Sequence, residues 1–244
     1  QRWDVQHLRA DHAGEHQART RALTGEAGGP AQCALGFGEI AYLREYHRGF
    51  CRVLDWVRQS GLPCLNQPAE IAEMFDKWAC HQRFVGAGLA RPRAELAPSS
   101  FSRLREGMKG HGRIFLKPLH GSSASGVCAL RWAPGEQAHP GWVQLIAPLR
   151  IVDGALVNSL RLTTYHRWSD IELILGQLLP QGMIAEQWIP KLALDGGVLD
   201  LRVLVIAGRA RHRVVRQSLG PMTNLHLGNS RGDEAALRAY LGEE

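Results

Sequence analysis

The segment from Arg113 to Leu130 constrains the fold more than any other part of this sequence. A short apolar run, Ile114-Phe115-Leu116, is followed by Lys117-Pro118, then by the small residues from Gly121 to Gly126, and then by the apolar run from Val127 to Leu130. Apolar runs of this length, bounded by glycine, are typical of β-strands. The segment is therefore predicted to form a strand, a loop and a second strand.

The composition of that loop, Gly-Ser-Ser-Ala-Ser-Gly, would let many backbone amides approach an anion, because small side chains do not obstruct phosphate oxygens. Its lysine precedes the glycines and lies at the end of a strand. A Walker-type P-loop instead has lysine after its second glycine and a helix directly downstream. Walker-type and Rossmann interpretations therefore fit poorly, and a plain flexible hairpin loop stays open as the alternative when this segment is taken alone.

The rest of the chain mixes both kinds of secondary structure. Apolar residues recur every three or four positions from Ile40 to Val57, which predicts a helix, and Pro68 opens a second helical region that runs toward Gly88. Ser169 followed by Glu172 has the pattern of a capping box and predicts the start of another helix. Strands are expected within Val143–Tyr165 around the turn signal Asp153-Gly154, at Gly182–Ile189, at Leu199–Ala207 and at Arg209–Gln217. Without strict alternation of strands and helices, the fold class is predicted to be α+β.

Composition limits the function further. The chain has 244 residues, 45% of them hydrophobic, and no stretch approaches the roughly 20 apolar residues of a membrane span, so a globular cytoplasmic protein is expected. Its five cysteines form no Cys-x-x-Cys pair, so neither a disulfide framework nor a zinc site is expected. The net charge of +6 suits an anionic partner, but no basic run of five residues and no interleaved aromatic residues indicate nucleic acid. Partners are therefore expected to be small molecules, with no nucleic acid and no membrane.

Several short motifs occur in a fixed order along the chain. They are Asn66-Gln67-Pro68, Asp76-Lys77, Gly88–Pro92, Phe115–Pro118, Gly121–Val127, Glu186–Pro190, Asp200–Val203, Arg216 and Asn224–Gly228. Each is unspecific by itself, but the ordered set over residues 60–244 resembles the ATP-grasp family, and within it the RimK-like and glutathione synthetase-like carboxylate–amine ligases. The resemblance implies an ATP-grasp fold of two α+β lobes that enclose ATP.

This resemblance implies which residues bind the nucleotide. Lys77 and Lys117 match the two lysines that reach the ATP phosphates, and the glycine-rich loop would fold over the triphosphate. The loop residues implied in phosphate contact are Gly121, Ser122, Ser123, Ser125 and Gly126. The adenine would lie against the linker formed by Glu186, Gln187, Trp188 and Ile189, and Asp195 is the candidate for the ribose hydroxyls.

The resemblance also implies a catalytic set of Arg202, Arg216 and Asn224. Arg216 matches the arginine that faces the transferred phosphate, where a guanidinium would stabilise charge on an acyl-phosphate. Asp200 is a candidate structural partner for Arg202, and Asn229 replaces the second glycine of the family's usual pair in a position expected to tolerate left-handed backbone.

The family binds Mg²⁺ through acidic strands that follow the next helix, and that helix is predicted from Asp233 to the end of the sequence. No metal ligand is therefore assigned here. The missing initiator Met at Gln1 and the stop within a helical run at Glu244 suggest a fragment, with the metal ligands expected beyond Glu244.

The expected organisation is a partial pre-ATP-grasp segment at 1–65, an N-terminal ATP-grasp lobe at 66–185 and an incomplete C-terminal lobe at 186–244. The expected function is ATP-dependent ligation of a carboxylate to an amine through an acyl-phosphate, with ATP and Mg²⁺ as cofactors, the fragment itself being inactive. Two alternatives stay open, an ATP-binding domain without ligase activity and a basic module that binds nucleic acid.

Overall fold

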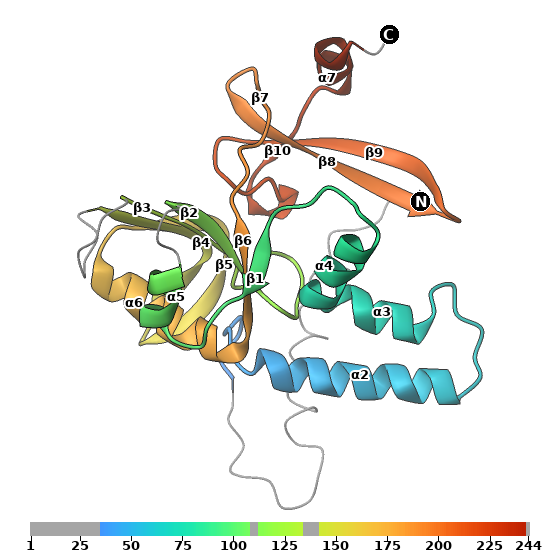
Figure 1. Ribbon diagram of the computed structural model, residues 1–244, viewed down its shortest axis with the longest axis horizontal. Helices are drawn as coiled ribbons and strands as arrows, with labels where there is room; N and C mark the ends of the chain where they lie inside the picture. Colours follow the sequence, from blue (N-terminus) through green and yellow to red (C-terminus); the bar gives the residue numbers. More distant parts are fainter. Residues whose placement is uncertain (1–34, 108–111, 134–141, 243–244) are drawn as a thin grey trace, which may run out of the picture. The chain divides into compact units, whose positions relative to one another are not determined.

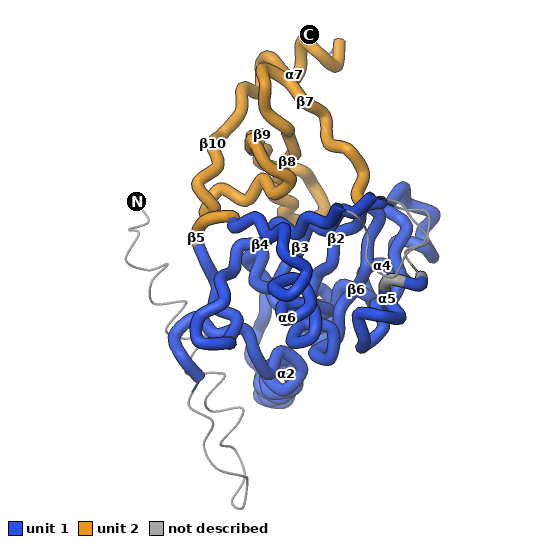
Figure 2. The backbone as a smooth tube through the Cα atoms, turned by 90° about the vertical axis from the view of Figure 1, so that its left-hand side faces the viewer, with its two compact units in different colours: residues 1–159, 163–187 blue, residues 160–162, 188–244 orange. Residues whose placement is uncertain are grey.

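The structure is a computed structural model that describes residues 35–107, 112–133 and 142–242 (Figure 1). Its described residues form two compact units, coloured separately in Figure 2. Unit 1 extends to Ser159 and includes Thr163–Gln187, whereas unit 2 consists of Leu160–Leu162 and the chain from Trp188 onward. Each unit has its own sheet.

Unit 1 is built on a six-stranded sheet in which all the pairs are antiparallel. In spatial order its strands are β1 (Ala94–Leu96), β6 (Met183–Gln187), β2 (Arg113–Pro118), β3 (Cys128–Trp132), β4 (Val143–Val152) and β5 (Ala155–Tyr165). The predicted strand, loop and strand around Gly121–Gly126 is confirmed as β2 and β3. The Asp153-Gly154 hairpin is confirmed too, with φ of 49° and 80°, as a tight turn with two left-handed residues requires.

The core of unit 1 lies under helix α6 (Trp168–Leu178), whose apolar residues follow the helical period. Ile171, Ile174, Leu175 and Leu178 are fully buried in one cluster with the inward-facing leucines of the sheet. The predicted capping box was wrong, because Arg167 is the N-cap residue and Ser169 already lies inside the helix. The Arg167 guanidinium donates to the Asp170 carboxylate at 3.0 Å across this first turn.

Unit 1 also contains helix α5 (Phe101–Gly107) and the 3-10 helix η1 (Leu179–Gln181). Helix α2 (Leu43–Gln59) confirms the helix predicted from Ile40 to Val57. On its apolar face Leu43 is buried, Phe50 and Leu54 are partly buried, and Val53 is 57% exposed.

The helical region predicted after Pro68 is two helices rather than one, α3 (Pro68–Met74) and α4 (Lys77–Gly86). The reason is Asp76, whose carboxylate accepts hydrogen bonds from the amides of Trp78 and Ala79 and so caps a new helix. This break makes Lys77 the first residue of α4.

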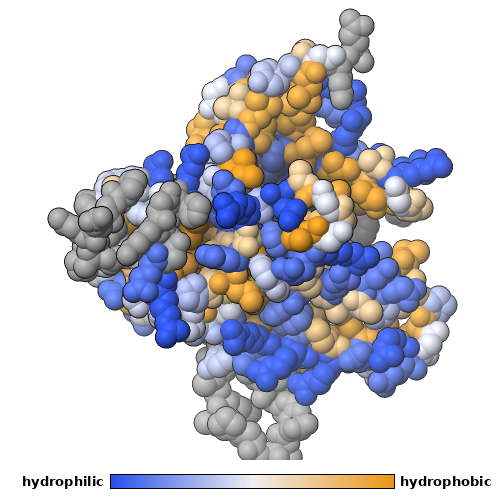
Figure 3. Space-filling view, in the orientation of Figure 1, coloured by the Kyte–Doolittle hydropathy of each residue, from blue (hydrophilic) through white to orange (hydrophobic). Residues whose placement is uncertain are grey.

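Unit 2 contains a four-stranded sheet in the order β10 (Ser230–Arg231), β9 (Arg209–Ser218), β8 (Gly197–Ile206) and β7 (Ala193–Leu194). The predicted hairpin joined at Gly208 is confirmed as β8 and β9. A 3-10 helix, η2 (Leu225–Leu227), and helix α7 (Glu234–Leu241), capped by Asp233, follow. Leu199, Val215, Met222 and Leu227 are buried, whereas the distal part of β8 exposes large apolar side chains of the kind coloured orange in Figure 3.

The α+β class predicted from the sequence is confirmed, and the antiparallel sheets with their helices are compatible with the ATP-grasp fold. None of the helices in the described residues is long and apolar enough to cross a membrane.

Helix α6 offers a matched pair of leucines that tests this packing. We expect Leu175→Ala to lower the free energy of unfolding by about 2–5 kcal/mol, because it removes a fully buried side chain and leaves a cavity. Leu173→Ala, on the same helix but 37% exposed, should cost far less. Urea denaturation followed by tryptophan fluorescence measures both, and equal losses would contradict the burial of this face.

Candidate functional site

The candidate phosphate-binding loop, Gly121–Gly126, has two lysines beside it, and the first, Lys117, lies at the end of β2. Lys117 and Phe115 point to the same face of the strand, and Glu186 on β6 is paired with Phe115, so Lys117 and Glu186 are diagonal neighbours across the sheet. Their side chains form an ion pair, and each is less than one third exposed. The Lys117 ammonium also lies 5.9 Å from the centre of the Phe115 ring.

The second cation comes from the start of α4. The backbone N–H of Lys77 donates to the Leu119 carbonyl at 3.0 Å, and Asp76 forms an isolated antiparallel bridge with His120. This pairing carries the Lys77 side chain to the beginning of the loop, where its Nζ donates to the Gly121 carbonyl at 2.9 Å. The Lys77 ammonium therefore bonds to a neutral acceptor at the loop entrance.

The two lysines influence each other electrostatically. Burial, followed by the positive charge of Lys117, lowers the pKa of Lys77 from 10.5 to about 8, against the opposing effect of Glu186 and Asp76. Two ammonium groups close enough to repel each other beside the same loop would both be stabilised by an anion bound there. The sequence-predicted pair Lys77 and Lys117 is thus brought together within unit 1.

The loop itself is folded as two consecutive turns. The amide of Ser125 donates to the Ser122 carbonyl and the amide of Val127 to the Ala124 carbonyl, each at 3.1 Å. Ser123 and Ala124 have positive φ, 55° and 60°, a conformation that costs an L-residue more than glycine. The predicted phosphate-contact residues therefore lie on a curled and locally strained backbone.

The far end of the loop is fixed by packing. A Cβ added to Gly126, whose φ is +68°, would approach Pro118 Cγ to 2.9 Å and contact Leu178 and Ile40. Only glycine fits this position without a shift. Just before it, the Ser125 Oγ atom is buried and has no hydrogen-bond partner.

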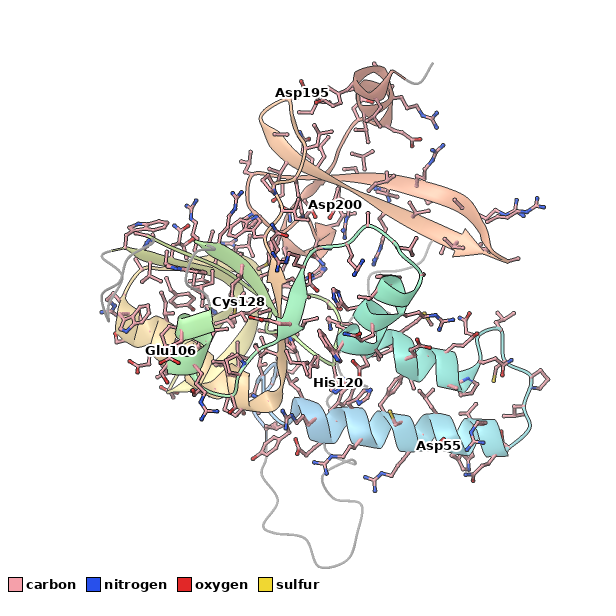
Figure 4. All side chains as sticks on the ribbon, in the orientation of Figure 1. Asp55, Glu106, His120, Cys128, Asp195 and Asp200 are labelled. Atoms are coloured by element: carbon pink, nitrogen blue, oxygen red, sulfur yellow. The ribbon has the colours of Figure 1, made fainter. Side chains whose placement is uncertain are left out.

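The predicted adenine linker crosses from the last strand of unit 1 into unit 2. Glu186 and Gln187 belong to β6, and the Gln187 amide donates to the Arg93 carbonyl. Ile189 is 49% exposed and Trp188 half-buried. Asp195, the predicted ribose ligand, lies with φ of 49° at the exposed turn between β7 and β8 (Figure 4). Their assignment to adenine and ribose stays a prediction.

Unit 2 holds a cluster of two cations and one carboxylate. Arg216 Nε and Nη2 donate to the two oxygens of Asp200 at 2.6 and 2.7 Å. Lys191 Nζ donates to Thr223 Oγ1 at 2.8 Å and lies 3.4 Å from Asp200 Oδ2, and the Thr223 hydroxyl donates to the same carboxylate oxygen. The Asp200 carboxylate, labelled in Figure 4, is thus the centre of this group.

Burial raises the pKa of Asp200, but hydrogen bonds from Arg216 and Thr223 and the charges of Lys191 and Arg216 outweigh it and lower that pKa below 3.8. The expected partnership of Asp200 with Arg202 was wrong. Asp200 is opposite Arg216 across β8 and β9, which brings their side chains to one face, whereas Arg202 is exposed opposite Val214.

The third predicted catalytic residue, Asn224, lies at the N-cap of η2. Its carbonyl, like that of Met222, accepts a hydrogen bond from the Asn229 side chain, at 2.9 and 2.8 Å. The left-handed residue of this segment is Gly228, with φ of 80°, whereas Asn229 does not have a positive φ. The side-chain amide of Asn229 instead stabilises the segment by donating to both carbonyls.

Two side-chain clusters were not predicted from the sequence. Lys191 and Thr223 join the Asp200 cluster from segments outside the strands, 32 residues apart in sequence, so no local pattern signals their contact. His47 stacks on His120 with ring centroids 3.6 Å apart, a contact between α2 and the loop that no local pattern signals. Among the described residues, no three His, Cys, Asp or Glu side chains gather as a metal site would require.

Comparison with known proteins gives partial matches. No family model matches the chain. Over 77 residues it is 35% identical to a protein of Mannheimia succiniciproducens named "Probable alpha-L-glutamate ligase" and 32% identical to proteins with the same name from Histophilus somni. The match covers 32% of this chain and 26% of each relative, so it spans about a quarter of the relatives' length.

The strained loop predicts opposite effects for two substitutions. Ala124→Gly should raise the free energy of unfolding by about 0.5–1 kcal/mol, because glycine relieves a left-handed conformation at the cost of a more flexible unfolded chain. Gly126→Ala should lower it by more than about 1 kcal/mol, since both its φ and the contact with Pro118 oppose a Cβ. Thermal and urea unfolding measure both, and a loss of stability in Ala124→Gly would show that the loop is not curled as described.

Proposed function

We propose that this chain binds ATP through the loop of unit 1 and acts as an ATP-dependent carboxylate–amine ligase of the ATP-grasp type. The observation that carries the proposal is the convergence of Lys77 and Lys117 on the strand end and loop at Gly121–Gly126. Both cations and the loop belong to unit 1.

The residues present fit a triphosphate. The Lys77 ammonium bonds a neutral carbonyl, and its lowered pKa reflects burial and repulsion that an anion would offset. The small side chains of the loop leave its backbone approachable, and the Ser125 hydroxyl is a donor without a partner. Charge-assisted bonds from two ammonium groups would supply most of the affinity.

The names of the relatives support the class of reaction. Proteins named as probable alpha-L-glutamate ligases match part of this chain, so L-glutamate is the amino acid that we propose as the amine substrate. In the proposed reaction a substrate carboxylate oxygen attacks the γ-phosphorus of ATP and ADP leaves. The amine then attacks the acyl carbon, inorganic phosphate leaves, and an amide bond forms.

Arg216 and its neighbours would serve the anionic groups of this reaction. The cluster carries two cations against one carboxylate, and the bidentate pair with Asp200 uses Nε and Nη2, so the Nη1 group lies outside that pair. Such an arrangement fixes the guanidinium plane while retaining a net positive charge. We propose that it stabilises negative charge on the transferred phosphoryl group. We propose the same catalytic context for Arg202 and Asn224.

Mg²⁺ would accompany ATP and neutralise phosphate charge. The part of the chain that the structure describes offers no cluster of acidic or histidine side chains for it, so no residue is assigned to the metal.

Removing the Lys117 ammonium should weaken ATP binding selectively. We expect Lys117→Met to raise the Kd for ATP about 10- to 150-fold, the equivalent of the about 1.5–3 kcal/mol of a hydrogen bond to a charged group. Arg113→Met is the matched control, because it removes an exposed cation from the same strand. Isothermal titration of both folded variants decides, and equal losses in both would place the nucleotide elsewhere.

Catalysis is tested separately from binding. We expect this chain by itself to bind ATP without turnover. In a protein that carries this chain together with Mg²⁺ ligands, ATP, Mg²⁺ and L-glutamate, supplied with a pool of peptide carboxylates, should give phosphate release that depends on both substrates, and Arg216→Met should abolish it while the Kd for ADP changes little. Coupled phosphate detection and mass spectrometry of the amide product provide the readouts. ATP binding without substrate-dependent phosphate release would favour a nucleotide-binding domain that lacks ligase activity.

A further inference from the structure

Two histidines from distant parts of the chain form a stacked pair beside the phosphate loop. His47 lies on α2 and His120 directly precedes Gly121, and their rings are 5° from parallel with centroids 3.6 Å apart. Cys51 Sγ lies 3.6 Å from His47 Nε2 one turn along α2. The stack therefore joins α2 to the residue immediately before the loop, and Figure 4 labels His120 at this place.

The backbone of His120 is held independently of its ring. Asp76 bridges to it, and the neighbouring Leu119 carbonyl accepts from the Lys77 amide. The His120 ring is therefore attached to the same fixed segment that presents the Gly121 carbonyl to the Lys77 ammonium.

One ring nitrogen of His120 is anomalous. Its Nδ1 atom is buried and has no hydrogen-bond partner, whereas buried polar atoms almost always have one. Burying a ring nitrogen without a hydrogen-bond partner costs free energy. Protonation of that nitrogen would turn it into a donor, and a nearby acceptor or anion could then offset this cost.

The groups that face the pair keep it neutral in the ligand-free protein. Burial, then the charge of His47, lowers the pKa of His120, and Lys77 adds to this, while Asp76 and a hydrogen bond to the Phe75 backbone oppose it. Burial also lowers the pKa of His47 against the opposing charge of Asp76. Cys51 beside His47 has a pKa raised mainly by burial, so its thiol carries no charge at neutral pH.

We propose that His120, stacked on His47, positions the start of the phosphate loop and takes up a proton when the phosphates of a nucleotide bind there. This rests on the proposed binding of ATP and deepens it by adding a positioning residue and a proton to the binding step. The protonated ring would remain stacked on neutral His47, an arrangement that a cation above an aromatic face favours. Asp76 stands beside both rings as the compensating carboxylate.

The sign of the pH dependence follows from the charges. Bound phosphates favour the protonated form of His120, so its pKa is higher in the complex than in the free protein. Affinity is then greatest below the free-state pKa and falls as pH rises through the pKa of the complex. Because the free-state pKa lies below 6.5, the steepest change is expected around and below neutral pH.

The experiment compares the full chain with His120→Phe, which retains a ring for stacking but cannot take up a proton. Isothermal titration with ATP is performed at roughly pH 6 and roughly pH 8, on either side of the ordinary histidine pKa of about 6.5, in two buffers with different ionisation heats. ATP and Lys77, whose pKa is about 8, also titrate in this range, but both are present with every variant, so the difference between proteins reports the contribution of the histidine. His81→Phe is the matched control, since the His81 ring stacks on Trp78 within α4 rather than on His47. His120→Asn is the second variant should the phenylalanine not be tolerated.

We expect the native protein and His81→Phe to gain more affinity toward low pH than His120→Phe, by up to about tenfold in Kd, and to take up correspondingly more protons. His47→Phe should retain the proton uptake, because His120 remains. The same pH slope and proton count in native and His120→Phe protein, with ATP bound, would overturn this inference and leave the proposed function standing. No binding of ATP by the native chain at either pH would overturn both.

Discussion

The backbone hydrogen bond from Lys77 to Leu119 is the constraint on which the candidate site in unit 1 depends. It joins the start of α4 to the end of β2, two segments about forty residues apart that share no sheet. Because Asp76 caps α4 immediately before this bond, the helix begins where the strand ends. The Lys77 ammonium is thereby delivered to Gly121, and His120 is brought to His47.

Charge is distributed in a similar way in the two units. In unit 1 one lysine is paired with Glu186 and the other bonds a neutral carbonyl. In unit 2 Lys191 and Arg216 share Asp200. Each group is partly withdrawn from water, where charge interactions are stronger than at an open surface, and each would be stabilised by an added anion. The shared property follows from residues contributed by each unit separately.

The sequence predicts those parts of the fold that local physical chemistry determines. Short apolar and β-branched runs place β2 and the β8–β9 hairpin, the helical period places α2, and Asp153-Gly154 sets the turn between β4 and β5. The sequence prediction is wrong at Ser169, because the helix already begins after Arg167 and Ser169 lies inside it. It is also wrong at Phe75-Asp76, because the Asp76 carboxylate caps a new helix within a continuous helical pattern. The proximity of Lys77 to Lys117 could be predicted only from the resemblance to the ATP-grasp family. The Asp200–Arg216 bond, the Lys191–Thr223 contact and the histidine stack depend on strand register and on contacts distant in sequence, which single-sequence patterns do not encode.

Lys77 is a partly buried cation whose charge a bound anion would stabilise, and its titration measures this directly. The chain contains only four lysines, Lys77, Lys109, Lys117 and Lys191, so lysine-labelled NMR spectra can be assigned with four single Lys→Arg variants. We predict that Lys77 has a pKa of about 8 in the free protein and a clearly higher pKa when ATP is bound. An Lys77 signal that titrates at the ordinary pKa of about 10.4 and does not move with ATP would contradict it.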